Sequence, residues 1–186
     1  MKIGIIADTH GNLRGWERAW ELALEGSDLI LHAGDVLYHG PKFDPVEAYS
    51  PRVLAEALND CPAPVIVARG NGDSDVDQLV LEMPVQSPYA FAQLEGLRVL
   101  VAHGHITPPE QLVPLAQRWG VDLLVTGHVH RPVLERCGGL LHVNPGTVTY
   151  PLAPEPELHR RTCAVWVDGE VTHYDIESGE RLNIGG

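Results

Sequence analysis

KIGIIADTH, residues 2–10, joins an apolar run with the character of a β-strand to a cluster of polar, metal-binding side chains. Five more apolar runs along the chain end in similar clusters of Asp, Asn or His beside glycine. The runs and their clusters are 29–33 before Gly34-Asp35, 65–69 before Gly70-Asn71-Gly72-Asp73, 97–102 before His103-Gly104-His105, 123–126 before Gly127-His128-Val129-His130, and 140–143 before Asn144-Pro145-Gly146. Because the loops after parallel strands gather at one edge of a sheet, where ligands bind, we expect one site built from many strand ends.

The clusters supply a set of candidate metal ligands. Carboxylate and amide oxygens combined with imidazole nitrogens suit Mn, Fe or Zn, and the absence of cysteine from the clusters argues against a thiolate site. One cation rarely takes so many ligands, so two cations that share a bridging aspartate fit the set better. The candidates are Asp8, His10, Asp35, Asn71, His103, His128 and His130.

The composition, with 44% hydrophobic and 20% charged residues, predicts a single globular domain that spans residues 1–186. The net charge of −12 disfavours long DNA or RNA as a partner, whereas bound divalent cations would still permit a small phosphate ester. No apolar run has the length of a membrane span or the form of a signal peptide, so we expect a cytoplasmic protein with no membrane partner. The three widely spaced cysteines predict no disulfide framework.

The beginning of the chain alternates strand, helix and strand, which is typical of a βαβ unit. Residues 36–52 contain three prolines and predict an excursion over the surface near the clusters. Residues 74–93 show no regular pattern, and 108–119 predict a helix that begins at a proline. Four short runs in the second half predict antiparallel hairpins that form a second sheet, and 151–161 predict a surface loop.

Each cluster taken alone also has an ordinary structural explanation. An aspartate at a strand end often caps a helix, and Asn71 between two glycines suits a left-handed turn. The paired histidines are more specific, because side chains at positions i and i+2 of an extended segment point to the same side. His39 is equally compatible with a catalytic and a structural role. The remaining histidines are expected to be structural or surface residues, and they are His32, His142, His159 and His173.

Taken in order, the clusters resemble the motifs of the calcineurin-like metallophosphoesterases from Lys2 to about Tyr150. Three further strings resemble the YfcE-type branch of small bacterial and archaeal phosphodiesterases, and they are GDVLYHGP at 34–41, VDQ at 76–78 and NPGTV at 144–148. The resemblance implies an α/β fold of four layers, an α-β-β-α sandwich of two mixed sheets flanked by helices. It also implies two divalent metal ions, commonly Mn with Fe, Zn, Ni or Mg as alternatives, and a homodimer or homotetramer.

The resemblance assigns a role to each candidate ligand. Asp8, His10 and His130 would hold the first cation, Asn71, His103 and His128 would hold the second, and Asp35 would bridge the two. Asp73 matches an acidic residue that orients a ligand without binding metal itself. The backbone amides of the turn 144–147 are expected to help orient ligands or substrate.

Two positions depart from the family pattern. Gly72 stands where many members have a histidine that stabilises the transition state or protonates the leaving group, and Tyr38 stands where many have an aspartate. Phosphomonoesterase and nuclease activities that depend on that histidine are therefore disfavoured. His39 and His105 are candidates to supply the proton in its place.

We therefore expect hydrolysis of a small phosphodiester by hydroxide bound to two metal ions, with Asp35, Asn71 and His103 at the reaction centre. One alternative is a non-catalytic scaffold of the same fold, like the related retromer subunit. That explanation becomes the better one when ligands are lost, and here every ligand position is filled. Another alternative is a phosphomonoesterase or nuclease of the same superfamily.

Overall fold

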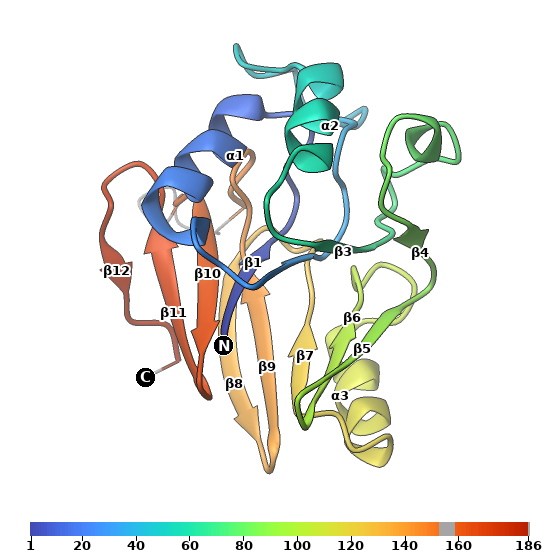
Figure 1. The fold of residues 1–186 in the computed structure, drawn as a ribbon, viewed down its shortest axis with the longest axis vertical. Helices are drawn as coiled ribbons and strands as arrows, with labels where there is room; N and C mark the ends of the chain where they lie inside the picture. Colours follow the sequence, from blue (N-terminus) through green and yellow to red (C-terminus); the bar gives the residue numbers. More distant parts are fainter. Residues whose placement is uncertain (153–158, 186) are drawn as a thin grey trace.

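The computed structural model describes residues 1–152 and 159–185, and in it two β-sheets pack face to face between helices (Figure 1). The first sheet, in spatial order, contains β12 (Arg181–Leu182), β11 (Glu170–Asp175), β10 (Thr162–Val167), β1 (Lys2–Ile6), β2 (Leu29–His32), β3 (Val65–Ala68) and β4 (Val85–Gln86). The second contains β5 (Ala90–Leu94), β6 (Leu97–Val101), β7 (Leu123–Val125), β9 (Leu140–Pro145) and β8 (Pro132–Cys137). The helical segments are α1 (Leu13–Ala19), the π-helix η1 (Trp20–Leu24), α2 (Pro51–Asn59), the 3-10 turn η2 (Asp77–Leu79) and α3 (Pro109–Arg118).

Three apolar clusters separate the four layers. Ile3 and Ile5 point between the two sheets, whereas Ile6 packs beneath α1 and α2. This alternation buries both faces of β1, which is why its sequence is almost continuously apolar. On the outer face of the second sheet, α3 inserts Leu112 and Ala116 into the third cluster. The predicted four-layer α-β-β-α sandwich is confirmed.

The strand directions bring the polar clusters together. β1, β2 and β3 run parallel in the first sheet, and β6, β7 and β9 run parallel in the second. The loops that follow these strands meet at one end of the sandwich. A contact between the sheets illustrates this meeting, because Nδ1 of His103, after β6, donates to the carbonyl of Ala33, after β2, at 2.7 Å.

The expectation that the four short runs of the second half form a second sheet is wrong for the last two of them. β10 pairs antiparallel with β1, and β11 and β12 continue outward, so the C-terminal hairpin extends the first sheet. β10 is buried on both faces, with Cys163 beneath the helices and Ala164 between the sheets. This burial follows from the position of β10 between the helix layer and the second sheet.

Residues 74–93 contain more regular structure than their sequence predicts. They include η2, β4 and most of β5, which pairs antiparallel with β6. Of the expected surface excursion at 36–52, residues 36–50 form no helix or strand, whereas 51–52 begin α2. The predicted surface loop 151–161 falls largely outside the described residues, because 153–158 are not among them.

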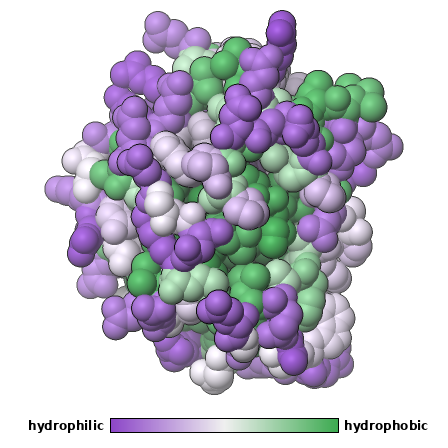
Figure 2. All heavy atoms as spheres, in the orientation of Figure 1, coloured by the Kyte–Doolittle hydropathy of each residue, from purple (hydrophilic) through white to green (hydrophobic). Residues whose placement is uncertain are grey.

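The surface has apolar areas outside the three core clusters. Figure 2 shows hydrophobic atoms at the upper right of the molecule, where Figure 1 places the loop that contains η2. In this loop Val76 and Leu79 are 66% and 83% exposed. Within the described residues, no helix is both long enough and apolar enough to cross a membrane.

Candidate metal centre

Most of the non-glycine residues with a left-handed backbone are candidate ligands. This conformation costs an L-residue roughly 1–2 kcal/mol, and such residues gather at functional sites where the surrounding structure holds them in place. Of seven in the described part of the chain, five belong to the clusters, with φ between 45° and 71°. These five are Asp8, His10, Asp35, His128 and His130.

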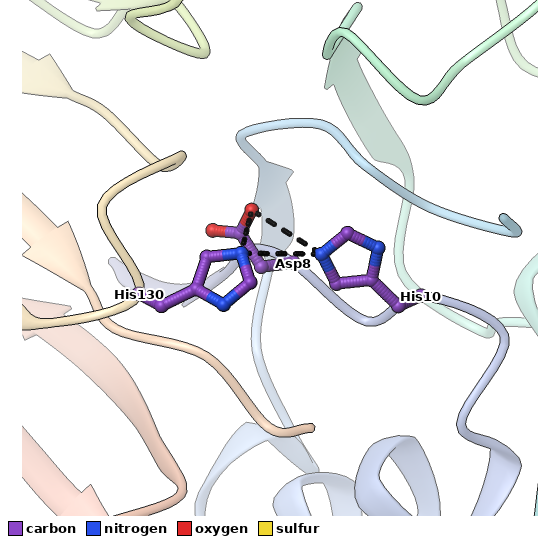
Figure 3. Close-up of side chains that lie close together, drawn as sticks. All are labelled: Asp8, His10 and His130. Carbon is purple, nitrogen blue, oxygen red and sulfur yellow. Dashed lines mark hydrogen bonds and ion pairs between the residues drawn. The ribbon is translucent and has the colours of Figure 1, made fainter. Parts of the chain in front are cut away.

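Asp8, His10 and His130 form one compact group at the end of β1 and in the loop after β7 (Figure 3). Oδ1 of Asp8 lies 3.3 Å from Nε2 of His130 and 3.9 Å from Nε2 of His10. The two Nε2 atoms are 3.2 Å apart. All three side chains are buried, so their charges and lone pairs face one another rather than water.

The opposite ring nitrogens fix the orientation of both imidazoles. Nδ1 of His10 donates to the carbonyl of Tyr38 and Nδ1 of His130 to the carbonyl of Tyr150, each at 2.6 Å. Because a carbonyl oxygen only accepts, each ring in its neutral form leaves the lone pair of Nε2 available to a cation. Burial acts to lower the pKa of His130, but the carboxylate of Asp8 outweighs burial and raises it, so a cation would displace a proton from this ring. Beside them, Oδ1 of Asp8 is buried with no hydrogen-bond partner among the described residues. Two Nε2 lone pairs and a buried carboxylate oxygen are a donor set that fits a divalent cation.

A second group lies next to the first. Oδ2 of Asp35 is 3.4 Å from Nε2 of His103 and 3.8 Å from Nε2 of His10, so this oxygen faces both groups. Nε2 of His103 also lies 3.2 Å from Oδ1 of Asn71 and 4.0 Å from Oδ1 of Asp8. Asp8, Asp35 and His103 offer ligand atoms that are all within 4.8 Å of one another. Two carboxylates thus lie between the two sets of histidines.

The electrostatics of the site indicate an excess of negative charge. Burial acts to lower the pKa of His103, but its hydrogen bond to Asp35 and the charges of Asp8 and Asp35 outweigh burial and raise the pKa to about 9. Burial acts to raise the pKa of Asp35, but the hydrogen bond and charge of His103 hold it well below its usual range. A proton on His103 therefore occupies the position that a metal ion would take, and metal binding would release it.

The loop after β3 holds Asp35 through its backbone. The carboxylate of Asp73 accepts hydrogen bonds from the amides of Asp35, Val36 and Gly70 at 2.7–2.9 Å. The amide of Gly72 donates to Oδ1 of Asp35 at 2.7 Å. Asp73 therefore orients Asp35 while its own oxygens are occupied by amides.

Two threonine hydroxyls, which the sequence analysis did not single out, hold the loop that carries Asp8. Oγ1 of Thr147 donates to the carbonyl of Asp8 and Oγ1 of Thr149 to the carbonyl of Thr9, both at 2.8 Å. Both threonines are buried. Their hydroxyls fix the carbonyl orientations that accompany the left-handed backbone of this loop.

The expected role of the turn 144–147 is wrong in one respect. The amide of Gly146 does not face the metal centre but donates to Oδ1 of Asn144 at 2.9 Å. Nδ2 of Asn144 in turn donates to the carbonyl of Gly127 at 2.8 Å, directly before the paired histidines. The turn therefore supports the loop of the paired histidines indirectly, through the side chain of Asn144.

The remaining candidates lie around the two groups. The amide of His128 donates to Oδ2 of Asp8 at 3.0 Å, and its ring centroid is 5.1 Å from that of His103. Burial, together with the charge of His103, lowers the pKa of His128, so that its ring is neutral and able to bind metal at pH 7. The ring of His105 is 5.2 Å from that of His103, whereas His39 lines the open cavity. His39 is thus better placed than His105 to meet a substrate.

Three other histidines have structural roles. His32 is fully buried, accepts from the amide of Gly34 and contacts the hydroxyl of Thr9, and burial lowers its pKa to about 4. His142 contacts the hydroxyl of a threonine at 2.9 Å. His173, which the sequence left open between a structural and a surface role, is only 1% exposed and donates to a buried carbonyl.

A cavity of about 520 Å³ opens over the metal centre. Its lining includes His10, Asp35, His128 and His130. Residues 38–43 form one flank of the lining, which also includes Arg69 and residues 71–74 of the loop after β3. This volume is within the range of small-molecule sites.

Comparison with known proteins places these features in a family. Residues 1–166 match the calcineurin-like phosphoesterase superfamily domain. The phosphodiesterase YfcE of Escherichia coli K12 is 43% identical over 157 residues, which cover 84% of each chain. A solved structure of the E. coli phosphoesterase YfcE matches with a TM-score of 0.83 and 33% identity, covering 98% of this chain and 97% of the other. Zinc-bound Vps29 from Entamoeba histolytica matches with a TM-score of 0.66 and 19% identity over 98% and 96% of the two chains, which shows the fold alone.

Proposed function

The chain belongs to the calcineurin-like phosphoesterase superfamily, and we propose that it is a metal-dependent phosphodiesterase that hydrolyses small phosphodiesters at a dinuclear centre. The observation that carries the proposal is the convergence of imidazole nitrogens on two buried carboxylates, beneath an open cavity. The similarity to YfcE extends over most of both chains and supports the same activity.

Each residue has a distinct task in this proposal. Two divalent cations, when bound, supply a water of lowered pKa and neutralise charge on the phosphoryl oxygens. Asp8 would help hold the first cation, with His10 and His130, and Asn71, His103 and His128 would hold the second. Asp35 faces histidines of both groups and would bridge the cations.

A poor leaving group such as an alkoxide departs faster when its oxygen receives a proton. Gly72 occupies the position at which many family members have a histidine, and a Cβ there would lie 3.2 Å from Oδ1 of Asp35. His39 lines the cavity, and its Nδ1 is buried without a hydrogen-bond partner among the described residues, which leaves Nε2 as the nitrogen that could reach a substrate. His39 is therefore our candidate to donate the proton, a contribution typically worth about 10²- to 10⁴-fold in rate.

Further parts of the proposal rest on the family resemblance and the composition. They are manganese as the resident cation, a homodimer or homotetramer, and a cytoplasmic location. The dominance of acidic residues and the volume of the cavity support a small diester rather than long nucleic acid as substrate.

Replacing Asp35, the proposed bridging ligand, tests the proposal. Asp35→Asn keeps the size of the side chain but removes a charge that both cations share, so we expect fewer than two cations per chain and loss of bis(p-nitrophenyl) phosphate hydrolysis. Metal content is measured by elemental analysis after stripped protein is reloaded with Mn, Mg, Zn or Fe. Asp168→Asn is the matched control, because Asp168 has a similar φ of 48° in a hairpin turn away from the cavity. Two cations and wild-type turnover in Asp35→Asn would refute the bridge.

A further inference from the structure

One flank of the cavity is unusually aromatic. The segment 38–43 contributes Tyr38, His39 and Phe43 to the lining, and Leu152 adds an aliphatic side chain. Tyr38 is 43% exposed and Leu152 is 47% exposed. Apolar side chains that remain exposed in the wall of a cavity are available to a ligand, whereas those in the core are already covered.

The aromatic rings of this flank are held in place by other rings. Phe43 stacks on Tyr150 with centroids 4.3 Å apart and planes 8° apart, and it also lies 5.9 Å from the ring of His130. Tyr38 meets the edge of His39 at 4.9 Å, and His39 in turn meets another ring at 4.9 Å. Rings fixed before the ligand arrives lose little conformational entropy on binding.

We propose that this flank, formed by Tyr38 and Phe43, selects phosphodiesters in which one ester group carries a planar aromatic ring, with a nucleoside as the fitting class. The inference rests on the proposed function, since Phe43 lies against His130, which would hold the first cation. A phosphate at the metal centre would therefore place a neighbouring ester group beside the flank. Stacking of a base on aromatic side chains is worth roughly 5- to 150-fold in affinity.

The charge and volume of the cavity favour a substrate with a single nucleoside over a nucleic-acid strand. Of the two cationic side chains in the lining, Arg69 is engaged by Asp75 and by the carbonyl of Asp73. Lys42 makes no hydrogen bond or ion pair within residues 1–152 and 159–185. One uncommitted cation can meet an additional anionic group, but it does not form the row of positive charge that a nucleic-acid strand requires. The volume of about 520 Å³ also suits a nucleoside phosphate rather than a polymer.

The test compares phosphate esters with and without an aromatic ring. Adenosine 5′-phosphate and ribose 5-phosphate carry the same charged group, and cyclohexyl phosphate offers a saturated ring. Binding of each to the manganese-loaded protein is measured by titration calorimetry, and hydrolysis of bis(p-nitrophenyl) phosphate is followed separately. We expect adenosine 5′-phosphate to bind about 5- to 150-fold more tightly than ribose 5-phosphate and more tightly than cyclohexyl phosphate.

Two variants test whether Tyr38 and Phe43 cause any preference for the aromatic ring. In Tyr38→Leu and Phe43→Leu the ratio of the two affinities should fall toward one, whereas Phe91→Leu, which alters a 50% exposed ring on β5, should keep the wild-type ratio. A wild-type ratio near one, equal binding of cyclohexyl phosphate, or a ratio unchanged in both flank variants would overturn the inference. Failure to hydrolyse the diester with any cation would instead contradict the proposed function, so the two failures are distinguishable.

Discussion

Replacing Thr147 by valine removes one buried hydroxyl while nearly preserving the shape of the side chain. That hydroxyl donates to the carbonyl of Asp8 at 2.8 Å and accepts from the amides of Thr149 and Tyr150 at 3.0 and 3.3 Å. Thr147 has no exposed surface, so water cannot replace the lost partners without rearrangement of the loop. The variant therefore tests whether a hydroxyl behind the site maintains the position of a metal ligand.

The contacts set the expected magnitude. A buried polar group left without a partner costs roughly 1–3 kcal/mol, and Thr147→Val strands the carbonyl of Asp8 and the amide of Thr149. We expect a loss of about 2–6 kcal/mol in the free energy of unfolding. Thr147→Ser keeps the hydroxyl and removes one methyl group, so its cost should be about 1 kcal/mol.

Urea denaturation in the presence of a chelator measures the stability, and competition with a metal indicator measures cation affinity. In Thr147→Val the loop of Asp8 should relax from its left-handed conformation, so affinity at the site of Asp8, His10 and His130 should fall with stability. Thr147→Ser should retain most of both properties. Equal stability of the two variants, or a destabilised valine variant that binds both cations as wild type does, would refute the reasoning.

Three further predictions concern other parts of the structure. Gly70→Ala would place a Cβ 2.1 Å from Oδ1 of Asp35 and should lower metal content and stability, whereas Gly72→Ala, at 3.2 Å, should be much milder; similar metal content in the two would contradict this. His32, with a pKa of about 4 against 6.5 when unfolded, stays neutral while the unfolded chain gains a proton. Stability of the metal-free protein should therefore fall by about 3 kcal/mol from this residue as the pH drops from 6.5 to 4, and His32→Asn should show a shallower slope in denaturation measured across that range. Burial raises the pKa of Cys163 to about 12, so iodoacetamide should label Cys163 only after unfolding. Detection of labelled Cys163 in the native protein by mass spectrometry would contradict this prediction.

Local sequence patterns predicted the elements that lie near the site better than they predicted the sheet arrangement. The run before Asp8 is apolar at every position because β1 is buried on both faces, and this property is visible in the sequence. The hairpin of β10 and β11 was also visible, but its turn specifies only which strands pair with each other. Its placement beside β1 depends on contacts across the whole chain, although the nearly continuous apolar sequence of β10 matches its burial on both faces.

The candidate ligands were predictable because their residue types carry the chemistry, although their assignment to individual cations stays a prediction. Their supporting partners were harder to find. His10 and His130 are oriented by the carbonyls of Tyr38 and Tyr150, and a backbone carbonyl leaves no mark on the sequence. The hydroxyl of Thr147 has a residue-type signal, but threonine is common in strands and turns for other reasons.

The left-handed backbone of the ligand loops explains why so much of this support acts on the main chain. Asp8 and His10 depart from the conformation that L-residues prefer, so the loop would relax if nothing held its carbonyls and amides. Thr147 holds the carbonyl of Asp8, and Asp73 holds the amide of Asp35. A cation that binds only this arrangement stabilises it further, by about 4 kcal/mol at a concentration 1,000 times its dissociation constant. Metal binding and the unusual backbone therefore stabilise each other, and a variant that relaxes either one should weaken the other.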